Sequence, residues 1–162
     1  MKIALFPGSF DPFTLGHYDL LKIATRIFDK VIVAVGYNHQ KRGFLTIENR
    51  LRLINDAIAP LRAEGADIEV ASYSGLTADF CRKTGASFIV RGVRNSIDFD
   101  AEATIARTNS KLLAGLETII LPSCGEHIHI SSTVVRDITI NGGDPSDLLP
   151  ENIEIKQYLN ND

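Results

Sequence analysis

The stretch IALFPGSFDPFTLGH, residues 3–17, predicts the fold and the place of the functional site. It begins with Ile3–Phe6, a continuous apolar run of the kind found in strands that are buried on both faces. Pro7-Gly8 ends this run, because proline and glycine favour a shaped turn over a helix. Gly16-His17 then opens a predicted helix, whose N-terminal N–H groups and positive dipole end suit a phosphate.

Four further apolar runs follow along the chain: Val31–Val35, Ile68–Ala71, Phe88–Val90 and Thr118–Leu121. Segments with helical spacing lie between them. Strands that alternate with helices predict an α/β fold, here a Rossmann-like open sheet of about five parallel strands with helices on both faces. No repeat or linker divides residues 1–162, so we expect a single domain. Ligands of such sheets bind beyond the carboxyl ends of the strands.

The helical segments each present an apolar face. A second helix is expected after Thr46, a predicted N-cap, and two more at about residues 99–113 and 133–140. The positions expected to face the core are Leu20, Leu21, Ala24, Ile27 and Phe28 in the first helix, and Leu51, Ile54 and Ile58 in the second.

Composition and charge exclude several classes of function. The formal net charge of −3 argues against broad attraction to nucleic acid, so local basic residues must hold any anionic ligand. The chain has no apolar run of about 18 residues, and its first apolar run is too short for a signal peptide. We therefore expect neither nucleic acid nor a membrane as partner. Cys81 and Cys124, two and far apart, fit a reducing cytoplasm better than a disulfide framework.

Basic residues follow two of the predicted strands. Lys41 and Arg42 come after the second strand and are, on their own, as compatible with ordinary solvated charges as with a site. Arg91-Gly92-Val93-Arg94 follows the fourth strand, where arginine forks suit phosphate and glycine permits close approach of the backbone. Glu102, on the next helix, is either a solvent-facing carboxylate or an orienting partner for a cation or hydroxyl group.

Hydroxyl groups and histidines follow the fifth strand. Ile130-Ser131-Ser132-Thr133 enters a helix, where hydroxyls serve as N-caps or form a second phosphate nest. His127 and His129 have no third ligand near them, so we expect no metal site built by the protein. Thr77 is a polar residue at a helix start after the third strand. The chain lacks a Walker A sequence and a Gly-x-Gly-x-x-Gly sequence, which excludes the commoner phosphate loops.

Thr14-Leu15-Gly16-His17 resembles the [His/Thr]-x-Gly-His signature of the nucleotidyltransferase superfamily. The clusters at Arg91–Arg94, Asp98–Glu102 and Ile130–Thr133 make the chain similar, over nearly its whole length, to the bacterial phosphopantetheine adenylyltransferases. That resemblance implies transfer of AMP from ATP to 4′-phosphopantetheine, giving 3′-dephospho-coenzyme A and pyrophosphate in the penultimate step of coenzyme A synthesis.

The resemblance also implies roles for individual residues. The acceptor would be held by Ser9, Lys41, Thr77 and Arg91, with His17, Ser9 and Lys41 as the catalytic set. Mg²⁺ would accompany ATP without a dedicated protein site, the assembly would be a homohexamer, and coenzyme A is a candidate feedback inhibitor on which the sequence is silent. The residues implied to contact ATP are Ser9, Phe10, His17, Gly92, Val93, Arg94, Glu102, His127, Ile128, His129, Ile130, Ser131, Ser132 and Thr133.

The chain departs from the family pattern at several positions: Ser9 replaces threonine, Ala101 replaces tyrosine, Thr77 replaces a larger apolar residue, and His127-Ile128-His129 replaces a stretch that often carries an aromatic residue. The superfamily motif alone does not identify the acceptor, so another phosphate compound is one alternative. A regulatory domain that binds nucleotide without catalysis is the other. A phosphate acceptor is largely dianionic near neutral pH, because its second pKa is about 6, so we expect His17 to stabilise charge rather than act as a base.

Overall fold

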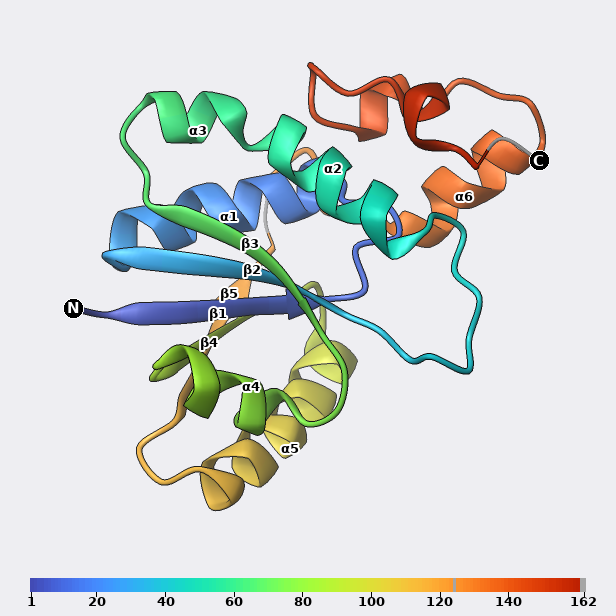
Figure 1. Ribbon diagram of the computed structural model, residues 1–162. Coiled ribbons are helices and arrows are strands. Elements are labelled where there is room, and N and C mark those ends of the chain that lie inside the picture. Colours follow the sequence, from blue (N-terminus) through green and yellow to red (C-terminus); the bar gives the residue numbers. More distant parts are fainter. Residues whose placement is uncertain (124, 161–162) are drawn as a thin grey trace.

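Five parallel strands form the sheet at the centre of the computed structural model, which describes residues 1–123 and 125–160 (Figure 1). Their order across the sheet is β3-β2-β1-β4-β5. All five lie where the apolar runs predict them, which confirms the Rossmann-like α/β fold. The strands are β1 (Ile3–Gly8), β2 (Lys30–Gly36), β3 (Ile68–Tyr73), β4 (Phe88–Val93) and β5 (Glu117–Pro122).

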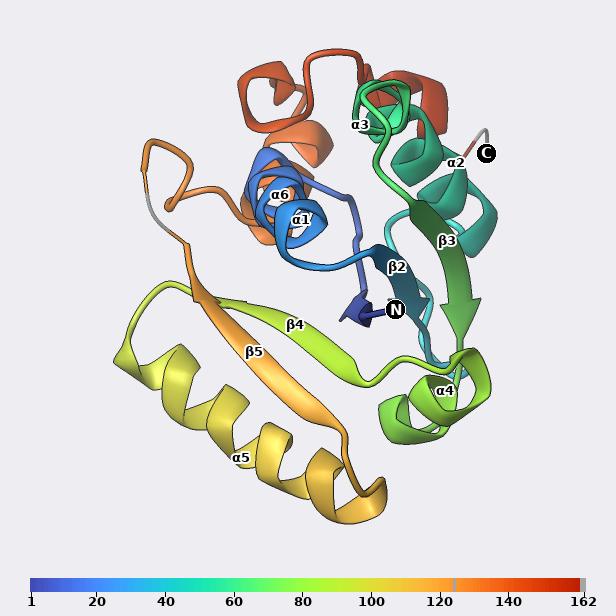
Figure 2. The same cartoon turned by 90° about the vertical axis from the view of Figure 1, so that its left-hand side faces the viewer.

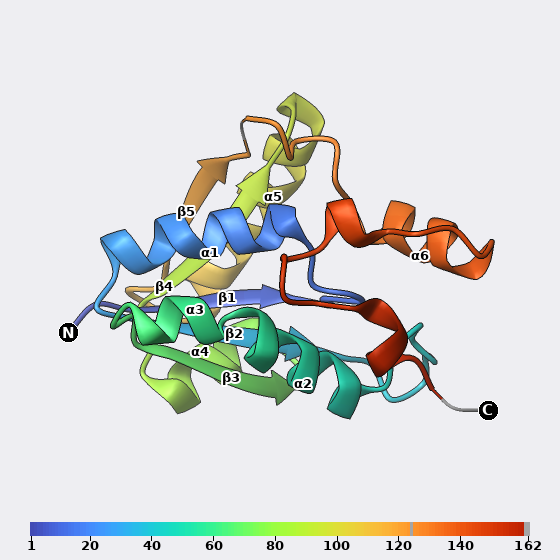
Figure 3. The same cartoon turned by 90° about the horizontal axis from the view of Figure 1, so that it is seen from above.

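Helices cover both faces of the sheet (Figure 2). One face carries α1 (Leu15–Ile27), α2 (Ile47–Ala57) and α3 (Ala59–Ala63), and the other carries α4 (Thr77–Thr84) and α5 (Ser96–Leu112). Helix α6 (Ser132–Ile140) lies on the α1 side but beyond the end of the sheet (Figures 1 and 3). Two short 3₁₀ helices, Ser146–Leu148 and Ile155–Tyr158, end the described chain, and the second packs beside α2. Thr46 caps α2 as predicted, since its Oγ1 accepts from the Asn49 N–H at 3.1 Å.

The apolar side chains of the sheet are divided between two cores. Phe6 and Val33 belong to the core under α1 and α2, whereas Leu5 and Ile32 belong to the core under α4 and α5. This division follows from the alternation of side chains along a strand. The central strands β1 and β2 are buried on both faces as predicted, but β3 and β5 are largely half-buried because each lies at an edge of the sheet.

The apolar face of α1 differs from the prediction at its last residue. Leu21 and Ala24 are fully buried, but Ile27 is 46% exposed, so its assignment to the core was wrong. The helix ends at Ile27, and Phe28 leaves it in an extended conformation. The Phe28 ring is buried in the core and packs on the Phe88 ring, at 5.2 Å between centroids.

The neighbouring strands β1 and β4 diverge toward their carboxyl ends. β1 pairs with β2 along its whole length, but with β4 only at Ala4–Phe88 and Leu5–Ile89. The connections on the two sides of this split run in opposite directions across the sheet, and ligands of open α/β sheets bind at such a switch point. Helix α6 lies beyond the carboxyl ends of β1 and β2 (Figure 3). The split is therefore where the site is expected.

Both diverging strands extend further than predicted. β1 continues through Pro7-Gly8, and β4 continues through Arg91-Gly92-Val93, so these residues are strand rather than loop. Proline is tolerated in β1 because the ladder to β4 has already ended, and no pairing on that side needs its missing N–H.

Within residues 1–123 and 125–160, no helix combines the length and apolar character needed to cross a bilayer. Cys81 is buried in the core under α4 and α5, and burial raises the pKa of its thiol to about 11. Cys124 lies outside the described residues.

Two substitutions in α1 test this packing. Leu21→Ala removes a fully buried side chain and should lower the free energy of unfolding by about 2–5 kcal/mol. Ile27→Ala should lower it by less than about 1 kcal/mol, because the side chain is largely exposed. Urea denaturation measures both, and equal losses would contradict the placement of Ile27.

Candidate active site

A cleft of about 390 Å³ opens between the separated ends of β1 and β4, and we call it the His17 cleft. It is lined from three places: the loop after β1, the end of β4 with α5, and the segment before α6. The structure thus brings together three of the regions that the sequence singles out, while those of Lys41 and Thr77 line other spaces. The predicted site residues that line it are Ser9, Phe10, His17, Arg91, Gly92, Arg94, Glu102, His127, Ile128, Ile130, Ser131 and Ser132.

Five predicted residues do not line the His17 cleft as the structure describes it. Val93 pairs with Pro122 in the sheet, and His129 and Thr133 are exposed. Thr77 lines a separate inner cavity of about 270 Å³. Lys41 lines a third space, the Lys41 hollow, which Ser9 also lines. The predicted role of Lys41 toward the acceptor phosphate therefore stays a prediction, to be exercised from this hollow and not from the cleft.

The His17 imidazole is held in one orientation by the start of α1. Its Nδ1 lies 3.0 Å from the backbone nitrogen of Thr14, which donates to it, and 3.2 Å from Thr14 Oγ1. The ring also packs against Phe10 and Phe13, at 5.0 and 5.5 Å between centroids. Because Nδ1 accepts from a backbone N–H, the proton of the neutral ring is on Nε2. His17 therefore offers the cleft a hydrogen-bond donor.

The surroundings of His17 favour its neutral form. Burial, and then the positive charges of Arg91 and Arg94, lower the pKa of the imidazole from 6.5 to about 4. A neutral imidazole with its Nδ1 occupied cannot accept a proton from a substrate there. It can donate from Nε2 to an oxygen that gains negative charge, as in an oxyanion hole.

Arg91 bridges the split in the sheet. Its Nε and Nη2 donate to the two Glu102 carboxylate oxygens at 2.9 and 2.7 Å, and its Nη1 donates to the Pro7 carbonyl at 2.5 Å. Glu102 is thus the orienting partner that the sequence left as one of two options. A guanidinium has five N–H groups, so in the described structure these bonds leave two of them for a ligand.

Two further contacts shape the walls of the cleft. Gly92 is approached by Leu20 of α1, since a Cβ at Gly92 would lie 2.2 Å from Leu20 Cδ1, so its lack of a side chain first serves packing. The backbone N–H of Arg94 donates to Asp98 at the start of α5, at 3.1 Å, and the Arg94 side chain faces the same carboxylate.

The hydroxyl groups at the start of α6 are engaged within the protein. Ser131 Oγ accepts from the Val134 N–H at 3.3 Å, and Ser132 Oγ donates to the Pro12 carbonyl at 2.7 Å. Thr133 Oγ1 accepts from Arg136. These side chains cap the helix and tie it to the loop after β1, so a phosphate at this end would be met by backbone N–H groups.

The segment before α6 is joined to α1 by a pair that sequence reasoning missed. His127 Nδ1 lies 2.5 Å from Asp19 Oδ2. With Nδ1 engaged by Asp19, Nε2 is the ring nitrogen of His127 that is left for another partner. No spacing signal links the two residues, because they come from segments distant in the chain.

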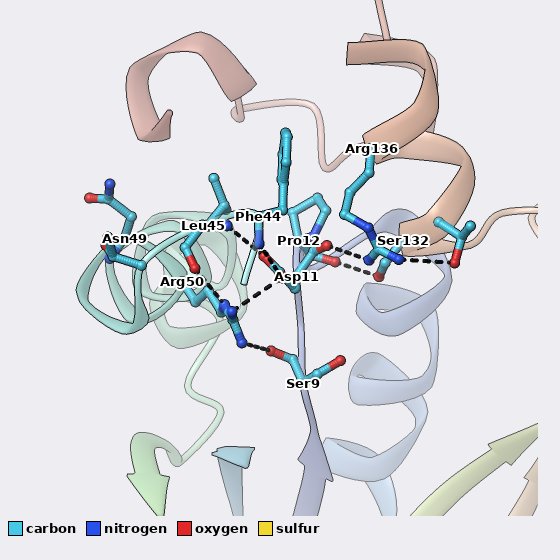
Figure 4. Close-up of polar contacts among 11 residues, drawn as sticks. Ser9, Asp11, Pro12, Phe44, Leu45, Asn49, Arg50, Ser132 and Arg136 are labelled. Carbon is cyan, nitrogen blue, oxygen red and sulfur yellow. Dashed lines mark hydrogen bonds and ion pairs between the residues drawn. The ribbon is translucent and has the colours of Figure 1, made fainter. Parts of the chain in front are cut away.

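A second missed pair, Asp11 and Arg50, holds the loop after β1 (Figure 4). Both residues are buried, and Arg50 Nη2 lies 3.1 Å from Asp11 Oδ2. Arg50 also donates to the Ser9 carbonyl at 3.2 Å, and Arg136 of α6 donates to the Asp11 carbonyl at 2.8 Å. A buried charged side chain needs a partner of opposite charge. Opposite charges at Asp11 and Arg50 could therefore have indicated this pair, but only once the burial of both residues was known.

The carboxylates around the cleft are already engaged. Glu102 holds Arg91, Asp98 faces Arg94, and Asp19 holds His127. Among the described residues no group of three or more His, Cys, Asp or Glu side chains could hold a metal ion. The guanidinium, imidazole and backbone N–H groups described in this cleft are donors that suit anions.

Comparison with known proteins defines the class of this fold and site. A family model described as cytidylyltransferase-like matches residues 5–138. The solved structure of a bifunctional NMN adenylyltransferase/ADP ribose pyrophosphatase from Francisella tularensis superposes with a TM-score of 0.71 at 17% identity, over 95% of this chain and 46% of that one. The chain is a nucleotidyltransferase by class.

Sequence relatives narrow that class. The phosphopantetheine adenylyltransferase of Flavobacterium psychrophilum is 45% identical over 156 residues, which is 96% of this chain and 100% of the relative. That of Leuconostoc citreum is 49% identical over 144 residues, 89% of this chain and 88% of the relative. The chain belongs to the phosphopantetheine adenylyltransferase family.

The state of His17 can be tested by titration. Histidine ring resonances followed by NMR from pH 7 to 3.5 should show His17 titrating near pH 4, with the signal identified by its loss in His17→Asn. Because the pKa is lower in the folded state, the stability that neutral His17 contributes is present above about pH 6.5 and is lost as the pH falls toward 4. A midpoint near 6.5 would show that the ring is not held neutral.

Proposed function

We propose that the protein transfers AMP from ATP to 4′-phosphopantetheine and releases 3′-dephospho-coenzyme A and pyrophosphate. The observation that carries this proposal is the junction of two spaces. The His17 cleft and the inner cavity share Pro7, Gly8, Ser9, Arg91 and Glu102. A nucleotide in the cleft and an acceptor in the cavity would therefore meet at Arg91, whose guanidinium is already oriented.

The His17 cleft supplies the features that a nucleotide triphosphate needs. Arg94 lies between β4 and α5, and the N-terminus of α6 adds backbone N–H groups near Ser131. We assign the β- and γ-phosphates to these groups. Glu102 would act on ATP only through Arg91. The sequence-predicted contacts of Val93, His129 and Thr133 would require these residues to approach the nucleotide from outside the cleft.

The inner cavity suits the arm of 4′-phosphopantetheine. It combines apolar side chains, among them Ile89 and Ile105, with the polar groups of Thr77, Asn109 and Thr118. Thr118 Oγ1 is buried and has no hydrogen-bond partner among the described residues. The short apolar stretches of the arm would pack against the isoleucines, and its amide groups would form hydrogen bonds with the polar side chains.

The chemistry follows from these placements. The acceptor phosphate is largely dianionic near neutral pH and attacks the α-phosphate of ATP in line, without a general base. The Nε2–H of His17 would donate to an α-phosphate oxygen as its charge grows. Arg91 would hold the acceptor phosphate, and Ser9 would add its hydroxyl group. Lys41 would reach the same phosphates from the hollow that it lines together with Ser9.

A divalent cation would accompany the nucleotide. A second structure of the Francisella tularensis enzyme is described as a complex with AMP and a manganese ion, and it superposes with a TM-score of 0.64. We propose Mg²⁺ for this chain. Since the cleft carboxylates are engaged by cationic side chains, phosphate oxygens and water would carry the ion.

We further propose that residues 1–162 act as one domain in a cytoplasmic homohexamer. Helix α5 has no fully buried residue, and Ile97, Phe99 and Ile105 are exposed on it, which supports contacts with further copies. Coenzyme A, which contains the same arm as the acceptor, would enter the inner cavity as a feedback ligand.

Removal of the His17 donor tests the mechanism. His17→Ala should lower kcat by about 100- to 1000-fold, the loss expected for one oxyanion donor. Pyrophosphate release from ATP with 4′-phosphopantetheine measures it, and an unchanged thermal midpoint controls for folding. Near-normal turnover would remove His17 from the mechanism.

Removal of the bridging arginine tests the acceptor. Arg91→Ala should raise the KM for 4′-phosphopantetheine by about 10- to 100-fold, because hydrogen bonds to a charged phosphate are lost. Arg82→Ala, in an exposed ion pair on α4, is the matched control and should change nothing. Turnover of nicotinate mononucleotide but not of 4′-phosphopantetheine would sink the proposed acceptor.

A further inference from the structure

We propose that the buried Asp11–Arg50 pair positions Lys41 and Ser9 together for the acceptor phosphate. The proposal rests on the function proposed above, which gives Lys41 and Ser9 their roles. Neither Asp11 nor Arg50 lines the His17 cleft or the inner cavity, so both would act through other residues. They form part of the wall of the Lys41 hollow.

Asp11 anchors the segment that carries Lys41. Its two carboxylate oxygens accept from the backbone N–H groups of Phe44 and Leu45, both at 2.8 Å (Figure 4). These are the last residues of the loop between β2 and α2 before Thr46, the N-cap of α2. Lys41 lies three positions before Phe44, in a turn closed by its own N–H to the Asn38 carbonyl. The position of the turn that carries Lys41 therefore depends on the contacts of Phe44 and Leu45 with Asp11.

Arg50 completes the connection from the side of α2. Its Nε donates to the Leu45 carbonyl at 3.0 Å, and its Nη1 donates to the Ser9 carbonyl at 3.2 Å. One rigid guanidinium thus touches both the Lys41 loop and the end of β1. Gly43 makes room for it, since a Cβ at Gly43 would lie 1.5 Å from Arg50 Nη2.

The chemistry explains why this pair is charged. Only a guanidinium can donate at fixed angles to Leu45, Ser9 and Asp11 at once, and only a carboxylate can accept from two adjacent N–H groups and still pair with it. A lysine at position 50 would keep the charge and lose the fork. The two segments would then be free to shift relative to each other.

The test is a double-mutant cycle of Arg50→Lys with Lys41→Ala. Arg50→Lys alone should raise the KM for 4′-phosphopantetheine about tenfold and leave the KM for ATP within about twofold. In the Lys41→Ala background the same change should add less than about threefold, because the residue through which it acts is gone. Asp11→Asn should repeat this pattern, and Asp79→Asn, in an exposed ion pair, is the matched control.

Three outcomes are decisive against the proposal. If the full effect of Arg50→Lys persisted in the Lys41→Ala background, Arg50 would act through another residue. A fall in kcat with both KM values unchanged would indicate only a loss of folded enzyme. Wild-type constants for Lys41→Ala would overturn the role of Lys41 in the proposed function itself, and with it this inference.

Hydrogen exchange gives a readout that does not depend on turnover. In Arg50→Lys the Phe44 and Leu45 amides should exchange at least about tenfold faster, while the Leu5 and Val33 amides of the sheet stay protected. A uniform increase across the sheet would show a general loss of stability, and no increase at Phe44 and Leu45 would show that the anchor does not need the fork.

Discussion

The separation of β1 from β4 is the constraint on which the rest of the site depends. Two strands that pair at Ala4–Leu5 and then diverge leave backbone groups without sheet partners, and such groups must be satisfied or hydrated. Arg91 satisfies one of them, the Pro7 carbonyl, while Glu102 holds the guanidinium from the other side. The same guanidinium, that of Arg91, thus satisfies the backbone where the strands separate and provides the positive charge that a phosphate would need.

The same principle recurs one layer further out. Arg50 bridges the Ser9 carbonyl and the Lys41 loop as Arg91 bridges β1 and β4, and each guanidinium is held by a carboxylate. The two differ in exposure, because the Arg50 side chain is buried and that of Arg91 is one-third exposed. Loss of one partner of a buried pair costs about 3–5 kcal/mol, whereas the half-open pair keeps donors for a ligand. The difference in burial therefore distinguishes the role of Arg50, which holds the structure, from that of Arg91, which can also bind a ligand.

The sequence alone predicts those parts of the fold that depend on local pattern. Val31–Val35 and its counterparts are continuous apolar runs, and His17 follows a turn marked by proline and glycine, so both were placed correctly. The pairing of Asp11 with Arg50 could not be predicted, because neither residue has a local signal that names the other. The position of the loop that carries Lys41 could not be predicted either, because the contact that anchors it, from the Phe44 N–H to Asp11, joins residues distant in the sequence.

The charges of the cleft link binding to the state of His17. Arg91 and Arg94 attract phosphate, and the same positive charges help to keep the imidazole neutral. A bound triphosphate brings negative charge into that field and opposes the effect of the two arginines on the pKa, while burial and the Nδ1 contact continue to favour the neutral ring with its proton on Nε2. The hydrogen bond from the Thr14 N–H to Nδ1 keeps the ring in the same orientation when nucleotide binds. His17 is thus a fixed, neutral hydrogen-bond donor beside phosphates whose charge shifts during the reaction. Such a group is suited to stabilising the transition state by hydrogen bonding, not to accepting a proton from the substrate.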